Sequence, residues 1–78
     1  MLTAMSDLKR GQVGIITSIG HGGNMRRRLI DIGFGIGSRV ILLAHAPLGE
    51  PIAFLIKGSV IALRRCDAEL ITIQTEDE

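Results

Sequence analysis

The stretch that decides the fold is GHGGNMRRRLIDIGFGIG, residues Gly20 to Gly37. It places three consecutive arginines between two groups of glycines. Met25, Leu29 and Ile32 recur at the spacing of one helix face, so residues 25–32 are predicted to form an amphipathic helix. The glycines on either side then act as turns that start and end this helix.

The two ends of the predicted helix carry different signals. Asn24 is a good N-cap, because its side chain can accept a hydrogen bond from the first turn. Gly33 falls at the C′ position, where a positive φ is needed, and Phe34 follows at C″. In that register Phe34 contacts Leu29 and closes a Schellman motif. Gly37 then lets the chain turn sharply into the next strand.

Two functional interpretations of this stretch are weaker than the structural one. A dinucleotide-binding GxGxxG pattern must follow a strand and open a helix, whereas Gly33, Gly35 and Gly37 end a helix. The arginines at 26–28 are consecutive, so on a helix they fan around the axis instead of lining one groove. The chain has no Trp or Tyr on which bases could stack. Nucleic acid is therefore not expected as a partner.

The segments around the helix have the β-branched and alternating character of strands. The predicted strands are residues 12–20, 38–45, 52–58, 59–64 and 71–76, with one helical turn possible at 65–70. About five short strands in so few residues, with a helix after the first, favour a mainly β fold. A small closed or nearly closed barrel is expected, because closure removes vulnerable sheet edges.

Length and charge limit the organisation of the chain. Its 78 residues allow a single domain spanning 1–78, and one cysteine excludes an internal disulfide. Residues 75–78 are expected to form a disordered acidic tail, which leaves nine basic and five acidic side chains in the body. No signal peptide or membrane-spanning run is apparent, so a cytoplasmic location without membrane insertion is expected.

The residues that could carry chemistry are few. His21, His45, Cys66 and Asp67 are the plausible metal ligands outside the tail, and they lack a clustered spacing. Surface histidines and a packed cysteine are expected instead. No nucleophile motif or paired carboxylates appear, so the sequence predicts no enzyme, no metal site, no cofactor and no catalytic residue.

Two predicted strands, VILLA and IAFLI, are apolar on both faces. The residues expected to point inward are Val40, Leu42, Phe54 and Ile56. Those expected to point outward are Ile41, Leu43, Ala53 and Leu55. Either the helix and the N-terminal turn cover this outward set, or it forms an apolar patch for a partner or for self-association.

Two long segments carry a family resemblance. RRLIDIGFGIGSRVILL (27–43) and GEPIAFLIKGSVIALRRCDAELI (49–71) resemble the FeoA family, small proteins of bacterial ferrous iron uptake. The resemblance implies an SH3-like β-barrel with a helical insertion. It also implies a partner, the GTP-hydrolysing membrane permease FeoB, approached from the cytoplasmic side.

The resulting hypothesis is a non-enzymatic accessory protein that binds FeoB. Its contact surface is predicted to combine Arg27 and Arg28 of the helix with Ile41, Leu43 and Leu55 of the strands. The resemblance leaves one alternative open, since the same module occurs at the C-terminus of DtxR-type repressors. In that case the chain would be a transition-metal-binding or metal-responsive regulatory module.

Overall fold

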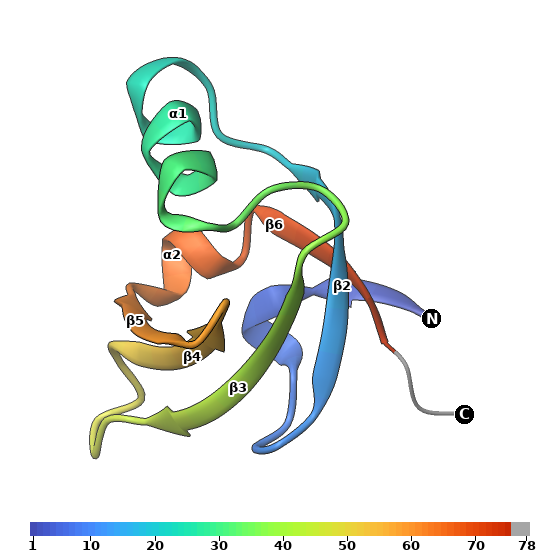
Figure 1. Cartoon of the computed structure of the whole chain (residues 1–78). Helices are drawn as coiled ribbons and strands as arrows, with labels where there is room; N and C mark the ends of the chain where they lie inside the picture. The colour runs from blue at the N-terminus through green and yellow to red at the C-terminus, as the bar shows by residue number, and fades with distance from the viewer. Residues whose placement is uncertain (76–78) are drawn as a thin grey trace.

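A computed structural model of the chain describes residues 1–75 and confirms a mainly β fold with a helix after the first predicted strand (Figure 1). The elements in chain order are β1 (Leu2–Ala4), the 3-10 helix η1 (Met5–Asp7), β2 (Val13–Ile19), α1 (Gly23–Ile32), β3 (Arg39–His45), β4 (Ile52–Ile56), β5 (Ser59–Leu63), α2 (Arg65–Ala68) and β6 (Ile71–Thr75).

The strands form one antiparallel sheet in the order β1-β6-β2-β3-β4-β5. There are six strands among the described residues, one more than predicted, because β1 pairs with β6 in a segment too short to show alternation. The sheet curls around the core (Figure 1), but β1 and β5 are not paired with each other. The sheet therefore keeps two hydrogen-bonding edges.

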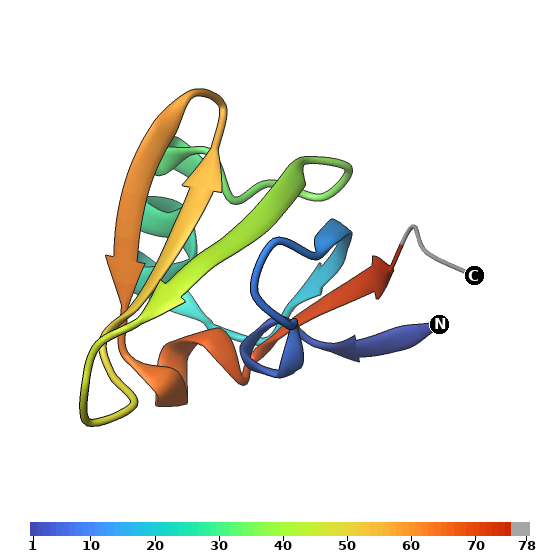
Figure 2. The same ribbon diagram turned by 90° about the horizontal axis from the view of Figure 1, so that it is seen from below.

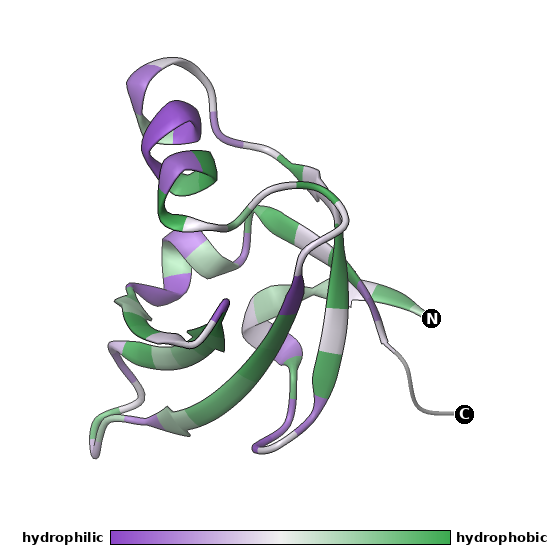
Figure 3. Cartoon of the chain, in the orientation of Figure 1, coloured by the Kyte–Doolittle hydropathy of each residue, from purple (hydrophilic) through white to green (hydrophobic). Residues whose placement is uncertain are grey.

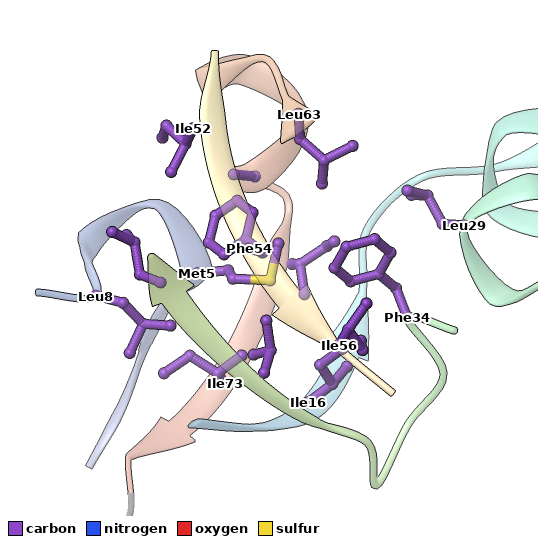
Figure 4. Close-up of a cluster of buried hydrophobic side chains, with 14 of the residues drawn as sticks. Met5, Leu8, Ile16, Leu29, Phe34, Ile52, Phe54, Ile56, Leu63 and Ile73 are labelled. Carbon is purple, nitrogen blue, oxygen red and sulfur yellow. The ribbon is translucent and has the colours of Figure 1, made fainter. Parts of the chain in front are cut away.

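The predicted alternation in β3 and β4 is confirmed. Val40, Leu42, Phe54 and Ile56 are buried, while their neighbours along each strand point to the other face. The core is aliphatic apart from Met5 and two phenylalanines (Figure 4). The rings of Phe34 and Phe54 meet edge to face, with centroids 6.5 Å apart and planes at 89°, a favoured geometry for aromatic pairs.

Helix α1 lies at one end of the molecule and is largely hydrophilic (Figures 1 and 3). Leu29 is buried and Met25 packs against the core, as the spacing predicts. The prediction for Ile32 is wrong, since this residue is 41% exposed. The chain leaves the helix at Gly33, and Phe34 fills the core position below the last turn.

The end of the chain differs from prediction by one residue. Thr75 belongs to β6 and pairs with Gly14 of β2, so it is not part of a tail. The remainder of the predicted acidic tail, residues 76–78, lies outside the described residues. Among residues 1–75, no helix is long and apolar enough to cross a bilayer.

Candidate partner-binding surface

The turn from α1 into β3 has the predicted Schellman geometry. Gly33 has φ of +133°, and its N–H donates to the Ile30 carbonyl at 3.1 Å. The Phe34 N–H donates to the Leu29 carbonyl at 2.8 Å, which is the C″-to-C3 hydrogen bond of this motif. Both Phe34 and Leu29 are buried, so the hydrophobic closure predicted between them is in place (Figure 4).

Gly37 completes this connection. Its φ is +91°, and its N–H donates to the Ile16 carbonyl at 2.7 Å. The N–H of Ile16 donates in turn to the Ser38 carbonyl at 2.9 Å. The predicted sharp turn is therefore held against β2, and it fixes where α1 stands relative to the sheet.

The predicted N-cap at Asn24 is wrong. Helix α1 begins at Gly23 with Gly22 as the preceding residue, and no side chain caps it. Gly23 has φ of +57°, so two consecutive glycines bring the backbone into the helix without a capping side chain. Asn24 lies within the first turn and is exposed.

The three arginines of α1 have different surroundings. Arg26 donates from Nη1 to the Ile19 carbonyl at 2.9 Å and so ties the helix to the end of β2. Arg27 and Arg28 are exposed. Arg27 also lines an open hollow of about 390 Å³ on the helix, together with Arg26 and Asp31. Sequence reasoning missed Arg26, although it lies three residues before the buried Leu29 and therefore close to the buried side of the helix.

A row of aliphatic side chains crosses the outer face of the sheet. Val13 pairs with Ile41, Ile41 with Leu55, and Leu55 with Val60, so one residue from each of four strands lies in register. These four residues are called the outer aliphatic row. Paired residues in a sheet share a face, and adjacent side chains on that face are in contact distance.

The row is only partly covered. Val13, Ile41 and Leu55 are half-buried, and Val60 is 63% exposed. Ile41 and Leu55 were predicted to face outward, whereas Val13 and Val60 were missed because pairing between distant strands is not visible in the sequence. Figure 3 shows that β3 is hydrophobic along most of its length, as expected of a strand with apolar residues on both faces.

Leu43, the third predicted strand residue, is not in register with the row. The pairing of β3 with β4 shifts between Leu42 and Ala44, which makes Leu43 the extra residue of a β-bulge. Leu43 is half-buried. Arg27 and Arg28 lie on α1, and within residues 1–75 neither makes a hydrogen bond or ion pair to a strand residue.

The surface position predicted for His21 and the packed position predicted for Cys66 are both wrong, whereas the surface position predicted for His45 is confirmed. The His21 side chain is 5% exposed, and its Nε2 lies 3.5 Å from Oδ1 of Asp67 on α2. Neither ring nitrogen has a hydrogen-bond partner among residues 1–75, so this contact is an ion pair only when the ring is protonated. Cys66 is exposed, and so is His45.

A second open hollow, of about 510 Å³, lies between the β3–β4 connection and α2. Its charged lining residues are Glu50, Arg64, Arg65 and Glu69. The Glu50 carboxylate accepts a hydrogen bond from the Arg65 backbone N–H at 2.8 Å, which holds the connection against α2. Within residues 1–75, no three His, Cys, Asp or Glu side chains are grouped closely enough to hold a metal ion.

Comparison with known proteins places this geometry in a family. The FeoA domain matches residues 3–75. A fusion of Fe(2+) transport protein A with the Fe(2+) transporter FeoB, from Porphyromonas gingivalis (strain ATCC BAA-308 / W83), is 30% identical over 70 residues. The match covers 90% of this chain but only 8% of the length of that relative.

Solved structures have the same fold. The FeoA protein of Chlorobium tepidum is 36% identical with a TM-score of 0.91, over 96% of this chain and 71% of that one. FeoA of Stenotrophomonas maltophilia, solved with zinc and described as a prokaryotic SH3-domain protein, is 26% identical with a TM-score of 0.81. That match covers 92% of this chain and 89% of the other.

A manganese-dependent transcriptional repressor also shares the fold, with a TM-score of 0.82, over 95% of this chain and 41% of that one. At 21% identity this likeness concerns the fold alone. The FeoA domain match over nearly the whole chain carries more weight. The chain therefore belongs to the FeoA family of ferrous iron transport and has its SH3-like fold.

Proposed function

We propose that the chain is a non-enzymatic accessory protein of bacterial ferrous iron uptake that docks on the cytoplasmic side of a FeoB-like GTPase-permease. The observation that carries this proposal is the relative in which the two proteins form one polypeptide. Two parts joined in one chain are held at high effective concentration, which suits partners that must stay in contact.

The outer aliphatic row is the part of the surface best suited to such docking. It combines four aliphatic side chains from four strands on a rigid sheet. Burying such side chains against a partner is favourable by about 25 cal/mol for each Å² of apolar area. Arg27 and Arg28 on α1 are proposed as a second, charged contact.

Co-purification tests the proposal with the full chain and the detergent-solubilised permease, in GTP-bound, GDP-bound and nucleotide-free states. The wild-type chain is expected to remain with the permease in at least one state. The double variant Ile41→Thr/Leu55→Thr removes two members of the row and places threonine, a residue that strands favour, at both positions. Its affinity is expected to fall by roughly tenfold or more, since two partly buried aliphatic contacts are lost.

A matched control makes the same chemical change elsewhere. Ile36 is 64% exposed and Leu48 is 97% exposed, and both lie outside the row. The variant Ile36→Thr/Leu48→Thr should bind like wild type. If both double variants bind equally well, the row is not the docking surface. If the wild-type chain binds in no nucleotide state, the docking proposal itself fails.

The alternative function is a transition-metal-binding or metal-responsive module. Its support is the zinc complex of the Stenotrophomonas maltophilia protein and the fold shared with the repressor. Anaerobic calorimetric titration with Fe(II) separates the two proposals. Tight stoichiometric binding of Fe(II) by the chain alone would favour the alternative. Binding of Fe(II) only when the permease is present would favour the docking proposal.

A further inference from the structure

Strand β5 forms one open edge of the sheet (Figure 2, orange arrow). It follows β4 through the two-residue turn Lys57–Gly58, in which both residues have positive φ. In such a hairpin the flanking pair, here Ile56 and Ser59, exchanges backbone hydrogen bonds. Since bonded and non-bonded pairs alternate, Val60 and Ala62 turn their N–H and C=O groups away from β4.

These edge groups have no other backbone partner in the described part of the chain. No backbone hydrogen bond joins Val60 or Ala62 to any of residues 1–75 outside β4. The edge therefore offers two N–H groups and two C=O groups at the spacing of a strand.

Natural sheets usually protect such an edge with lysine, proline or a bulge. Within β5, the sequence SVIAL contains no charged residue and no proline, and its pairing with β4 is regular from Ser59 to Leu63. The other edge strand, β1, is only three residues long. The unprotected edge at β5 is thus long enough to accept a further strand.

The side chains along this edge alternate in a way that favours a particular partner. Val60, Ala62 and Arg64 are all exposed and lie two residues apart. Arg64 has φ of −69° and ψ of 152°, so the backbone is still extended there. Neither Arg64 nor Lys57, at the opposite end of β5, has a carboxylate in ion-pair distance among residues 1–75.

We propose that β5 accepts an extended segment of the permease as an added strand, with a carboxylate beside Arg64 and an aliphatic side chain beside Val60. This inference rests on the proposed function and assigns it a binding mode. The backbone of the added segment would satisfy the N–H and C=O groups of Val60 and Ala62. Its aliphatic side chain would extend the outer aliphatic row by one strand.

The charges at the ends of β5 disfavour a second copy as the occupant. Lys57 precedes β5, and Arg64 and Arg65 follow it. A two-fold antiparallel pair centred on Ile61 would bring the Lys57 end of each copy close to the arginine end of the other, and like charges brought close together repel one another. A segment with acidic residues at its ends would instead place a negative charge near Lys57 and another near Arg64.

Amide hydrogen exchange with residue-level resolution tests the binding mode in the complex of the full chain with the detergent-solubilised permease. The amides of Val60 and Ala62 should exchange at least about tenfold more slowly in the complex, because each gains an acceptor. The amides of Ile61 and Leu63, which already bond to β4, should change much less. Complex formation with unchanged exchange at Val60 and Ala62 would overturn the inference and leave docking intact.

Two variants provide an independent measurement of affinity. Ala62→Pro removes an edge N–H but none that bonds β4, and proline is tolerated on such edges. Arg64→Glu reverses the unpaired charge, and Arg10→Glu, before β2, is its matched control. Both edge variants should bind roughly fivefold more weakly or worse, with Arg10→Glu unchanged.

Circular dichroism of each variant should match wild type. Wild-type affinity in both edge variants would overturn strand addition, whereas failure of the wild-type chain to bind would overturn the proposed function and this inference with it. Sedimentation measures whether the chain forms dimers without the permease. Concentration-dependent dimers, together with slowed exchange at Val60 and Ala62, would show that a second copy occupies the edge. That result would overturn the proposal of an acidic permease segment.

Discussion

Replacing Gly33 by alanine tests the Schellman turn that places α1. The added Cβ would lie 3.5 Å from Cδ of Lys57 and 3.8 Å from Cγ1 of Ile56. Both are ordinary contacts, so the methyl group fits. The cost therefore comes from the backbone, because φ of +133° is a conformation that only glycine adopts readily.

The size of the effect follows from two opposing contributions. Holding an alanine at positive φ costs about 2 kcal/mol. The smaller conformational entropy of the unfolded alanine chain offsets about 0.4–1 kcal/mol of this. The free energy of unfolding should thus fall by about 1–2 kcal/mol, out of roughly 4–12 kcal/mol expected for a domain of this size.

Urea unfolding followed by far-UV circular dichroism measures this loss, since the chain has no Trp or Tyr for fluorescence. With a slope of about 1 kcal/mol per molar urea, the midpoint should shift by about 1–2 M. Gly35→Ala is the matched control: Gly35 lies in the same connection without positive φ, and its Cβ would meet only Ser38 Oγ at 3.9 Å. Equal midpoints for the two variants would refute the backbone argument.

Three further predictions concern single residues. Gly20→Ala should lower the free energy of unfolding by about 1–3 kcal/mol, because its Cβ would lie 2.9 Å from the Leu70 carbonyl oxygen. Gly22→Ala, where the methyl meets open space, is the control in the same urea assay. His21→Leu should change the free energy of unfolding by less than about 1 kcal/mol, because the buried ring makes no hydrogen bond to residues 1–75; a larger loss would reveal a partner for the ring. Cys66 should react with a thiol reagent at the same rate in native and urea-unfolded protein, because it is exposed; protection in the native state would contradict its position.

The parts of the fold that could be predicted depend on local signals. Gly33, Phe34 and Gly37 are recognisable because two turn glycines and an aromatic residue lie between the end of the helix pattern and the start of the next strand pattern. The alternation of Val40 and Leu42 with outward-facing residues is local in the same sense. These predictions are confirmed because each feature depends on the backbone conformation of its own short segment.

The parts that could not be predicted depend on contacts between distant segments. His21 is buried because α2, more than forty residues later in the chain, packs beside it, and Cys66 is exposed on that same helix. The outer aliphatic row exists only once Val13 and Val60 come into register with β3 and β4. Asn24 failed as a cap for a different reason, because the preceding glycines can start a helix alone.

The pairing of β1 with β6 has a consequence for how this module can be joined to others. It brings Met1 beside Thr75, whose N–H donates to the Met1 carbonyl at 3.0 Å (Figure 1). Both attachment points thus lie at the sheet margin farthest in strand order from β5. A domain joined covalently at either point would be attached beside β1 and β6. The edge strand β5, at the other end of the strand order, would remain accessible to a binding partner. The matches to longer chains agree with this arrangement, since the matched region makes up 8% of the FeoA–FeoB fusion and 41% of the manganese-dependent repressor that shares the fold.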